Sequence, residues 1–292
     1  MTVQQNLTHD VLELAGTIAN GLGKIEGVVA VSLDGAWASG EHDLDADINL
    51  GLYYRDTERP SVEALRDFAR RLNNSLSADV VTDFWAHGPL INGGALLWVE
   101  GQRVDWHYRE IDYVRREIEN ARRGIVMGHY QPGYPQGFFS HYLVGIVNQC
   151  RPLFDPQGEL VKLKAGTESY PAPLKEALLR NFIREADLTL FAAQKSAADE
   201  DVYYTVGCLQ RCVSCLIQAL FAVNERYITH ERDALEKLMH LEQRPDHFAG
   251  LVTSILSSPG TSAAELQDSI AQLQGLVSEI RLEYISPLYV GL

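Results

Sequence analysis

Positive charge is scarce in this chain. Its 292 residues include 25 lysines and arginines against 39 aspartates and glutamates, a formal net charge of −14 with an isoelectric point near 5.0. No extended basic stripe is present, which argues against a general binder of nucleic-acid backbones. The partner expected from this composition is a small molecule, either a cationic one or a nucleotide brought in with its metal.

Long apolar runs are missing as well. The sequence has no run of roughly 18 or more apolar residues, the length of a membrane-spanning helix. The N-terminal sequence MTVQQNLTHD lacks the basic and apolar regions of a signal peptide. We therefore expect no membrane partner and a cytoplasmic protein. With 46% apolar and 22% charged residues the chain is expected to be globular, and its length suits about two domains.

Cysteine is rare, with four residues at Cys150, Cys208, Cys212 and Cys215. The last three are spaced i, i+4 and i+7 in an apolar stretch, so they share one face of the expected helix. A zinc site needs a fourth ligand, and zinc ligands gather better on loops than along one helix. We therefore expect buried thiols in a reducing compartment rather than a metal centre.

The most informative stretch is VVAVSLDGAWASGEHDLDADINLGLYY, between Val28 and Tyr54. It predicts an apolar strand, a glycine-containing turn, a polar connection and a second strand. Alternate residues of a strand share a face, so Asp45, Asp47 and Asn49 project to the same side. A row of acidic groups on an otherwise apolar strand repels itself unless a cation is bound there. Oxygen ligands of this kind suit Mg²⁺.

This stretch resembles the signature of the polymerase-beta-type nucleotidyltransferases, which include the aminoglycoside nucleotidyltransferases. The resemblance consists of Gly35-Ala36, ten intervening residues, and Asp47-Ile48-Asn49-Leu50. A third carboxylate is expected on a later strand, and GQRVDWHYR supplies Asp105. The chain departs from the pattern at Ala36, where the family usually has Ser, and at Asn49, where it usually has the second Asp.

The resemblance implies transfer of a nucleoside monophosphate, AMP from ATP, to an acceptor hydroxyl with release of pyrophosphate. Two Mg²⁺ ions are expected as cofactors, with Asp47, Asn49 and Asp105 as metal-binding and catalytic residues. Asp47 would bridge both ions, and Asp105 would be the acceptor-side ligand or the base. The resemblance suggests a small molecule such as an aminoglycoside as one acceptor, and transfer to a protein hydroxyl is a separate hypothesis.

Four residues are candidates for nucleotide binding. Gly35 lets backbone N–H groups approach phosphate oxygens closely, because it has no Cβ. Ala36 keeps the backbone donor but lacks the hydroxyl. Ser39 either supplies a hydroxyl in its place or only caps a helix. Arg211 stands among apolar residues and is either a phosphate-reaching cation or an arginine paired with an acid at the edge of the core.

Three alternatives stay open. The working pair could be Asp45 and Asp47, because a shift of two residues keeps the face. Asp105 could be a hairpin carboxylate paired with Arg103 or Arg109. Finally, Asn49 brings no negative charge, and one charge near 4 Å contributes on the order of 4 kcal/mol at a surface-like dielectric. Losing it would slow a charge-dependent step by roughly a thousandfold, so a catalytically silent, nucleotide-binding relative that acts through a partner is the second hypothesis.

The expected fold class is α+β, a small mixed twisted sheet with flanking helices over residues 1–125, followed by an all-α bundle over residues 126–292. The sheet is expected from strands at 28–33, 46–54, 79–85, 95–99 and 103–108, the last two joined as a hairpin at Glu100-Gly101. Helices are expected at 8–22, 61–76, 111–123 and 138–149, with a short one near Pro156. In the second half they are expected at 174–194, 203–227, 231–242, 247–256 and 263–284.

Overall fold

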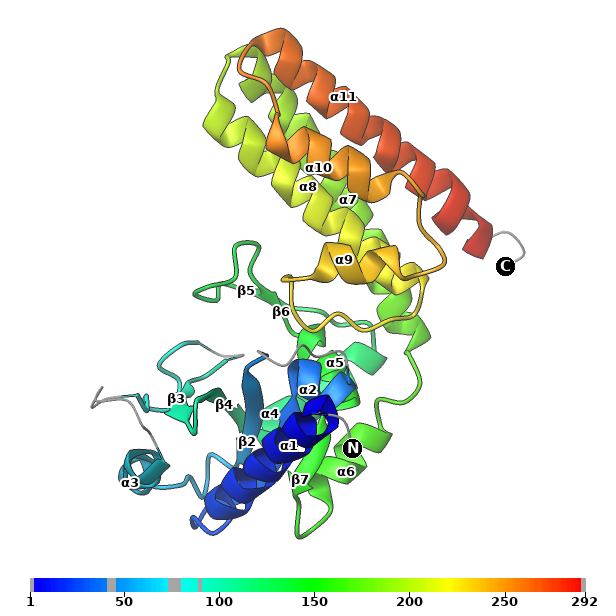
Figure 1. Cartoon of the computed structure of the whole chain (residues 1–292). Coiled ribbons are helices and arrows are strands. Elements are labelled where there is room, and N and C mark those ends of the chain that lie inside the picture. The colour runs from blue at the N-terminus through cyan, green and yellow to red at the C-terminus, as the bar shows by residue number, and fades with distance from the viewer. Residues whose placement is uncertain (1–2, 41–45, 73–79, 89–90, 290–292) are drawn as a thin grey trace. The chain divides into compact units, whose positions relative to one another are not determined.

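The computed structural model describes residues 3–40, 46–72, 80–88 and 91–289 (Figure 1). The chain forms two compact units, one of Met1–Asn120 with Met127–Ser169 and the other of Ala121–Val126 with Tyr170–Leu292. A mixed sheet with flanking helices is followed by a helical region, so the α+β prediction is confirmed. The division differs from the predicted boundary at residue 125, because residues 127–169 belong to the first unit.

The first unit contains a five-stranded sheet in the order β3-β4-β2-β1-β7. Its central pair, β2 and β4, is parallel, and every other neighbouring pair is antiparallel. The predicted hairpin is present as β3 and β4, while β7 was not predicted from the sequence. The strands are β1 (Val28–Asp34), β2 (Ile48–Tyr54), β3 (Gly94–Val99), β4 (Gln102–Glu110) and β7 (Arg151–Phe154).

The two faces of this sheet differ in polarity because the strands alternate. One face carries the hydrophobic core, in which strand residues pack with α1 and α3. The other face carries polar side chains, with Asp34 of β1 paired in register with Asn49 of β2, and Asn49 paired with Asp105 of β4. Strand residues of the apolar face include Val31, Leu33, Ile48, Leu50, Leu52, Leu97, Val104, Trp106 and Tyr108.

The first unit also contains helices that flank the sheet and a separate two-stranded ladder. The helices follow the predicted apolar spacing closely, although α1 begins earlier than expected, at Val3. The elements are α1 (Val3–Leu22), α2 (Gly35–Ser39), α3 (Val62–Leu72), α4 (Ile111–Arg122), β5 (Gly128–His129), β6 (Phe138–Phe139), α5 (His141–Gln149) and α6 (Glu159–Ala165).

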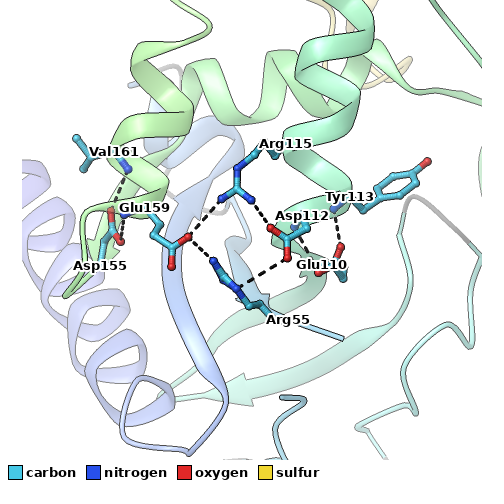
Figure 2. A network of polar contacts seen from close by, with 8 residues as sticks. All are labelled: Arg55, Glu110, Asp112, Tyr113, Arg115, Asp155, Glu159 and Val161. Atoms are coloured by element: carbon cyan, nitrogen blue, oxygen red, sulfur yellow. Dashed lines mark hydrogen bonds and ion pairs between the residues drawn. The ribbon is translucent and has the colours of Figure 1, made fainter. Parts of the chain in front are cut away.

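A network of charged side chains joins the end of β2 to two helices (Figure 2). Arg55 lies 2.6 Å from Glu159 of α6 and 3.8 Å from Asp112 of α4, measured between nitrogen and oxygen. Arg115, one turn further along α4, contacts the same two carboxylates. Arg55 follows the last residue of β2 and Asp47 precedes the first, so the network lies at the other end of the strand from the acidic residues.

One predicted strand is wrong. Of the stretch 79–85, residues 80–85 are described, and only Val81 forms a bridge, to Ala95. Trp85 has φ of 64°, in the left-handed region, which an extended strand does not accommodate. The apolar alternation of this stretch therefore reflects packing beside β3 and not a further strand of the sheet.

The second unit is helical, as predicted. Its elements are α7 (Ala172–Ala198), α8 (Val202–Val223), α9 (Ala234–Met239), α10 (Phe248–Ser257) and α11 (Ala263–Glu279), which continues into a π-helical turn (Ile280–Ile285) and a 3₁₀ turn (Ser286–Tyr289). Of the described helices, α8 is long and apolar enough to cross a membrane by length and composition. Its apolar window is 67% buried within the structure, which is typical of a core helix. Cys208, Cys212 and Cys215 lie on it, buried and unbonded to one another, so the prediction of buried thiols is confirmed.

Candidate functional site

The acidic residues gather where β2 and β4 begin. These strands run in parallel, and their register places Asn49 beside Asp105. Asp47 comes two residues before Asn49, and the amide nitrogen of Asn49 donates to the backbone carbonyl of Asp47 over 3.2 Å. Asp105 therefore lies on β4, and Asp47 lies directly before the neighbouring strand β2, at the same end of the parallel pair.

Arg103 links these carboxylates. Its Nε lies 3.5 Å from an oxygen of Asp47, and its Nη2 lies 3.7 Å from an oxygen of Asp105. The contact with Asp105 is the ion pair given above as the alternative interpretation of this residue. Arg109, the other arginine in that alternative, has a different partner. The two carboxylates therefore lie close enough together to contact one guanidinium.

Asp105 is the more buried of the two acids, with 16% of its side chain exposed against 33% for Asp47. Burial raises the pKa of Asp105 to about 6; Arg103 opposes this shift and Asp47 adds to it. Its Oδ1 is buried and has no hydrogen-bond partner among the described residues. A buried carboxylate oxygen without a donor is a costly arrangement, and a bound cation would relieve it.

The glycine turn lies against the same residues. Gly35 has φ of 63°, a left-handed value that favours glycine. A Cβ built on Gly35 would lie 3.4 Å from the side-chain amide nitrogen of Asn49, so the turn packs beside Asn49. Trp37 is buried in α2, and its indole N–H donates to the carbonyl of Ala46 over 2.9 Å, which ties the turn to the residue before Asp47.

The remaining nucleotide-binding candidates are placed as follows. Ala36 lies in the first turn of α2, and the Ser39 hydroxyl donates to its carbonyl over 3.2 Å, the helix-end role considered above for this serine. Arg211 belongs to the second unit, where its guanidinium contacts Glu185 over 2.6 and 2.7 Å. This is the acid-paired arrangement considered for Arg211, and a role in nucleotide binding stays a prediction. Asp45, of the alternative register, lies outside the described residues.

A buried ion pair supports the turn from within, and the sequence analysis missed it. Asp34, the residue before Gly35, accepts from Arg109 over 2.5 Å and from the Ser32 hydroxyl over 2.7 Å. Arg109 also donates to the Tyr53 hydroxyl over 3.3 Å. Burial lowers the pKa of Arg109, but Asp34 and Tyr53 outweigh burial and raise it, so the guanidinium is charged. A Cβ on Gly51 would collide with Arg109 and Ser32, which explains glycine there.

The signal that could have revealed this pair is the alternation itself. Ser32 and Asp34 interrupt an apolar strand on one face, Gly51 stands at the matching place in β2, and Arg109 lies on the strand that carries Asp105. A carboxylate and a guanidinium on one face of a sheet, with a glycine on the strand between them, have room to meet, and buried charges are usually paired in this way.

The donor set fits a divalent cation. Asp47 and Asp105 offer carboxylate oxygens, and Asn49 offers an amide oxygen, which are ligands that Mg²⁺ accepts. Within the described part of the chain no group of three or more His, Cys, Asp or Glu side chains could hold a metal, so among the described motif residues the amide of Asn49 is the candidate third ligand. The unpartnered oxygen of Asp105 supports the fit.

Comparisons with known proteins add little to this geometry. No family model matches the chain, and no curated protein matches it. Among solved structures it is similar to a nucleotidyltransferase-like protein from Exiguobacterium sibiricum 255-15, with 12% sequence identity and a TM-score of 0.46, over 93% of this chain and 77% of that one. A likeness with this score carries no argument for fold or function, so the proposal below depends on the sequence motif and the site geometry.

Proposed function

We propose that the protein is a Mg²⁺-dependent nucleotidyltransferase that moves AMP from ATP to an acceptor hydroxyl. The observation that carries this proposal is the convergence of the motif residues: Asp47 and Asp105 share one guanidinium, and Asn49 lies beside the glycine turn. Two acids on opposite faces of the sheet could not hold one ion, and the sequence motif would then have been coincidental. Their contact with one guanidinium supports the resemblance in a way that sequence spacing alone does not.

In this proposal Asp47, Asn49 and Asp105 would hold the Mg²⁺, which would neutralise phosphate charge and acidify the attacking hydroxyl. Gly35 leaves room for a phosphate oxygen beside the backbone. The acceptor oxygen bonds to the α-phosphorus as the bond from that phosphorus to pyrophosphate breaks. Asp105 would be the acceptor-side ligand of the ion or the base that takes up the hydroxyl proton.

The acceptor class follows from charge. The chain has a formal net charge of −14, which favours encounter with a cationic small molecule in the cytoplasm, where ATP and Mg²⁺ are abundant. Aminoglycosides, suggested by the family resemblance, are one such class.

The proposal is tested by calorimetry with ATP, with and without Mg²⁺, followed by an assay of pyrophosphate release. ATP should bind only with the metal, and Asp105→Asn should abolish this binding. Asn49→Asp restores the usual carboxylate and should raise turnover by up to about a thousandfold, the effect of one charge near 4 Å. ATP binding that depends neither on the metal nor on Asp105 would refute the proposal.

A second candidate is a nucleotide-binding protein without turnover, which acts by occupancy on a partner. Ala36 and Asn49 favour it, because each lacks a group that the family uses for catalysis. Metal-dependent ATP binding without pyrophosphate release, with release appearing in Asn49→Asp, would identify this case. Transfer to a protein hydroxyl would appear as AMP-modified proteins when cell extract is incubated with enzyme and ATP and analysed by mass spectrometry.

A further inference from the structure

Two arginines on the same face of β4 are held very differently. Arg109 is 7% exposed and fixed at 2.5 Å from Asp34. Arg103 is 44% exposed, and its contacts with Asp47 and Asp105 measure 3.5 and 3.7 Å. A charge-assisted hydrogen bond is about 2.7–2.9 Å long. Arg109 is therefore part of the framework, whereas Arg103 is held loosely by charge and can leave.

Arg103 contacts both of the carboxylates that a metal ion would need. Its partners are Oδ2 of Asp47 and Oδ2 of Asp105, while Oδ1 of Asp105 is the oxygen that has no partner. A guanidinium and a divalent cation cannot both be neutralised in full by the same two carboxylates, and their positive charges repel each other at this distance. The site therefore contains its own competitor for the ion, on a long side chain whose exposed end has room to move.

We propose that Arg103 is an exchangeable counter-cation: it pairs with Asp47 and Asp105 while no divalent ion is bound, and it transfers to a phosphate of the incoming triphosphate when the ion enters. This inference rests on the proposed function. A guanidinium suits both partners, because its planar donors match carboxylate and phosphate oxygens equally well.

The exchange has a consequence for how the metal arrives. A free ion that binds here must displace Arg103 into water, where the guanidinium finds no new anionic partner. An ion carried by a triphosphate brings a new partner for the guanidinium. The site therefore binds free divalent ions weakly and prefers the metal–nucleotide complex, which makes Arg103 a determinant of specificity for that complex.

The test is a titration with Mn²⁺, in which electron paramagnetic resonance measures the free ion, with and without a non-hydrolysable ATP analogue. The variants are Arg103→Met, which keeps the stem and removes the charge, and Arg70→Met as the matched control. Arg70 is another exposed arginine of the first unit that pairs with two carboxylates, Glu63 and Asp67, away from the site. Tryptophan fluorescence verifies that each variant is folded.

Arg103→Met should bind free Mn²⁺ about tenfold more tightly than the unaltered protein, since the two ion pairs of the half-exposed Arg103 are long and each is modest. It should bind the Mn²⁺–analogue complex no more tightly, because the phosphate contact is lost. Arg70→Met should change neither affinity. Unchanged or weaker Mn²⁺ binding in Arg103→Met, with binding still abolished in Asp105→Asn, overturns this inference and leaves the proposed function standing. No Mn²⁺ binding by any variant, with or without the analogue, overturns both.

Discussion

The buried pair of Asp34 and Arg109 should be a main determinant of the first unit's stability. Both side chains are 7% exposed, and the nitrogen–oxygen distance is 2.5 Å. Arg109→Met leaves the carboxylate buried without its countercharge and removes the hydrogen bond to Tyr53. Breaking one partner of a buried ion pair costs about 3–5 kcal/mol, so we expect a loss of that size in the free energy of unfolding.

Tryptophan fluorescence during denaturant unfolding measures this loss. The four tryptophans, Trp37, Trp85, Trp98 and Trp106, all belong to the first unit, so the signal reports on that unit alone. Asp34→Asn combined with Arg109→Met should cost less than the sum of the single changes, with a coupling of about 1–3 kcal/mol.

Arg70→Met makes the same substitution at an exposed ion pair and should have little or no effect. The reasoning is refuted if Arg109→Met is as mild as Arg70→Met, or if the double change shows no coupling. Either result would mean that water reaches the pair and screens it.

Three further predictions concern other positions. Gly51→Ala should cost about 1–3 kcal/mol by pushing into Arg109, whereas Gly16→Ala, where a Cβ meets open space in α1, should gain about 0.5–1 kcal/mol; both are read by the same fluorescence transition. Burial raises the pKa of Asp105 from 3.8 to about 6, so the folded state holds a proton that the unfolded state has released. Stability should therefore fall as pH rises between these values, and Asp105→Asn should lack this part of the slope. Asp201 caps α8 through the amide of Tyr204, so Asp201→Ala should lower the second unit's stability by about 1 kcal/mol, measured by circular dichroism.

Local pattern predicted much of the first unit. The hairpin of β3 and β4 followed from Glu100-Gly101 between two apolar runs, and both residues indeed have positive φ. The face shared by Asp47 and Asn49 followed from strand alternation. These features depend on neighbours in sequence, so residue order alone was sufficient to predict them.

The missing parts depend on residues far apart in the chain. The pairing of β7 with β1 joins Leu33 to Arg151 across the turn and four helices, and a strand of four residues leaves almost no periodic signal. The placement of Arg103 between two acids, and of Arg109 against Asp34, depends on strand order, which the sequence did not determine. The predicted boundary at residue 125 fell too early for the same reason, since β7 completes the sheet.

The central claim is that Asp47 and Asp105 hold a divalent ion against a triphosphate. Crystals grown with Mn²⁺ and a non-hydrolysable ATP analogue test it directly, because the anomalous scattering of manganese locates the ion without assumptions about the site. The account predicts a peak within bonding distance of both carboxylates, with the analogue's phosphates on its other side and Arg103 turned away from Asp47. A nucleotide bound with its manganese elsewhere, and Arg103 still between the two acids, would contradict it.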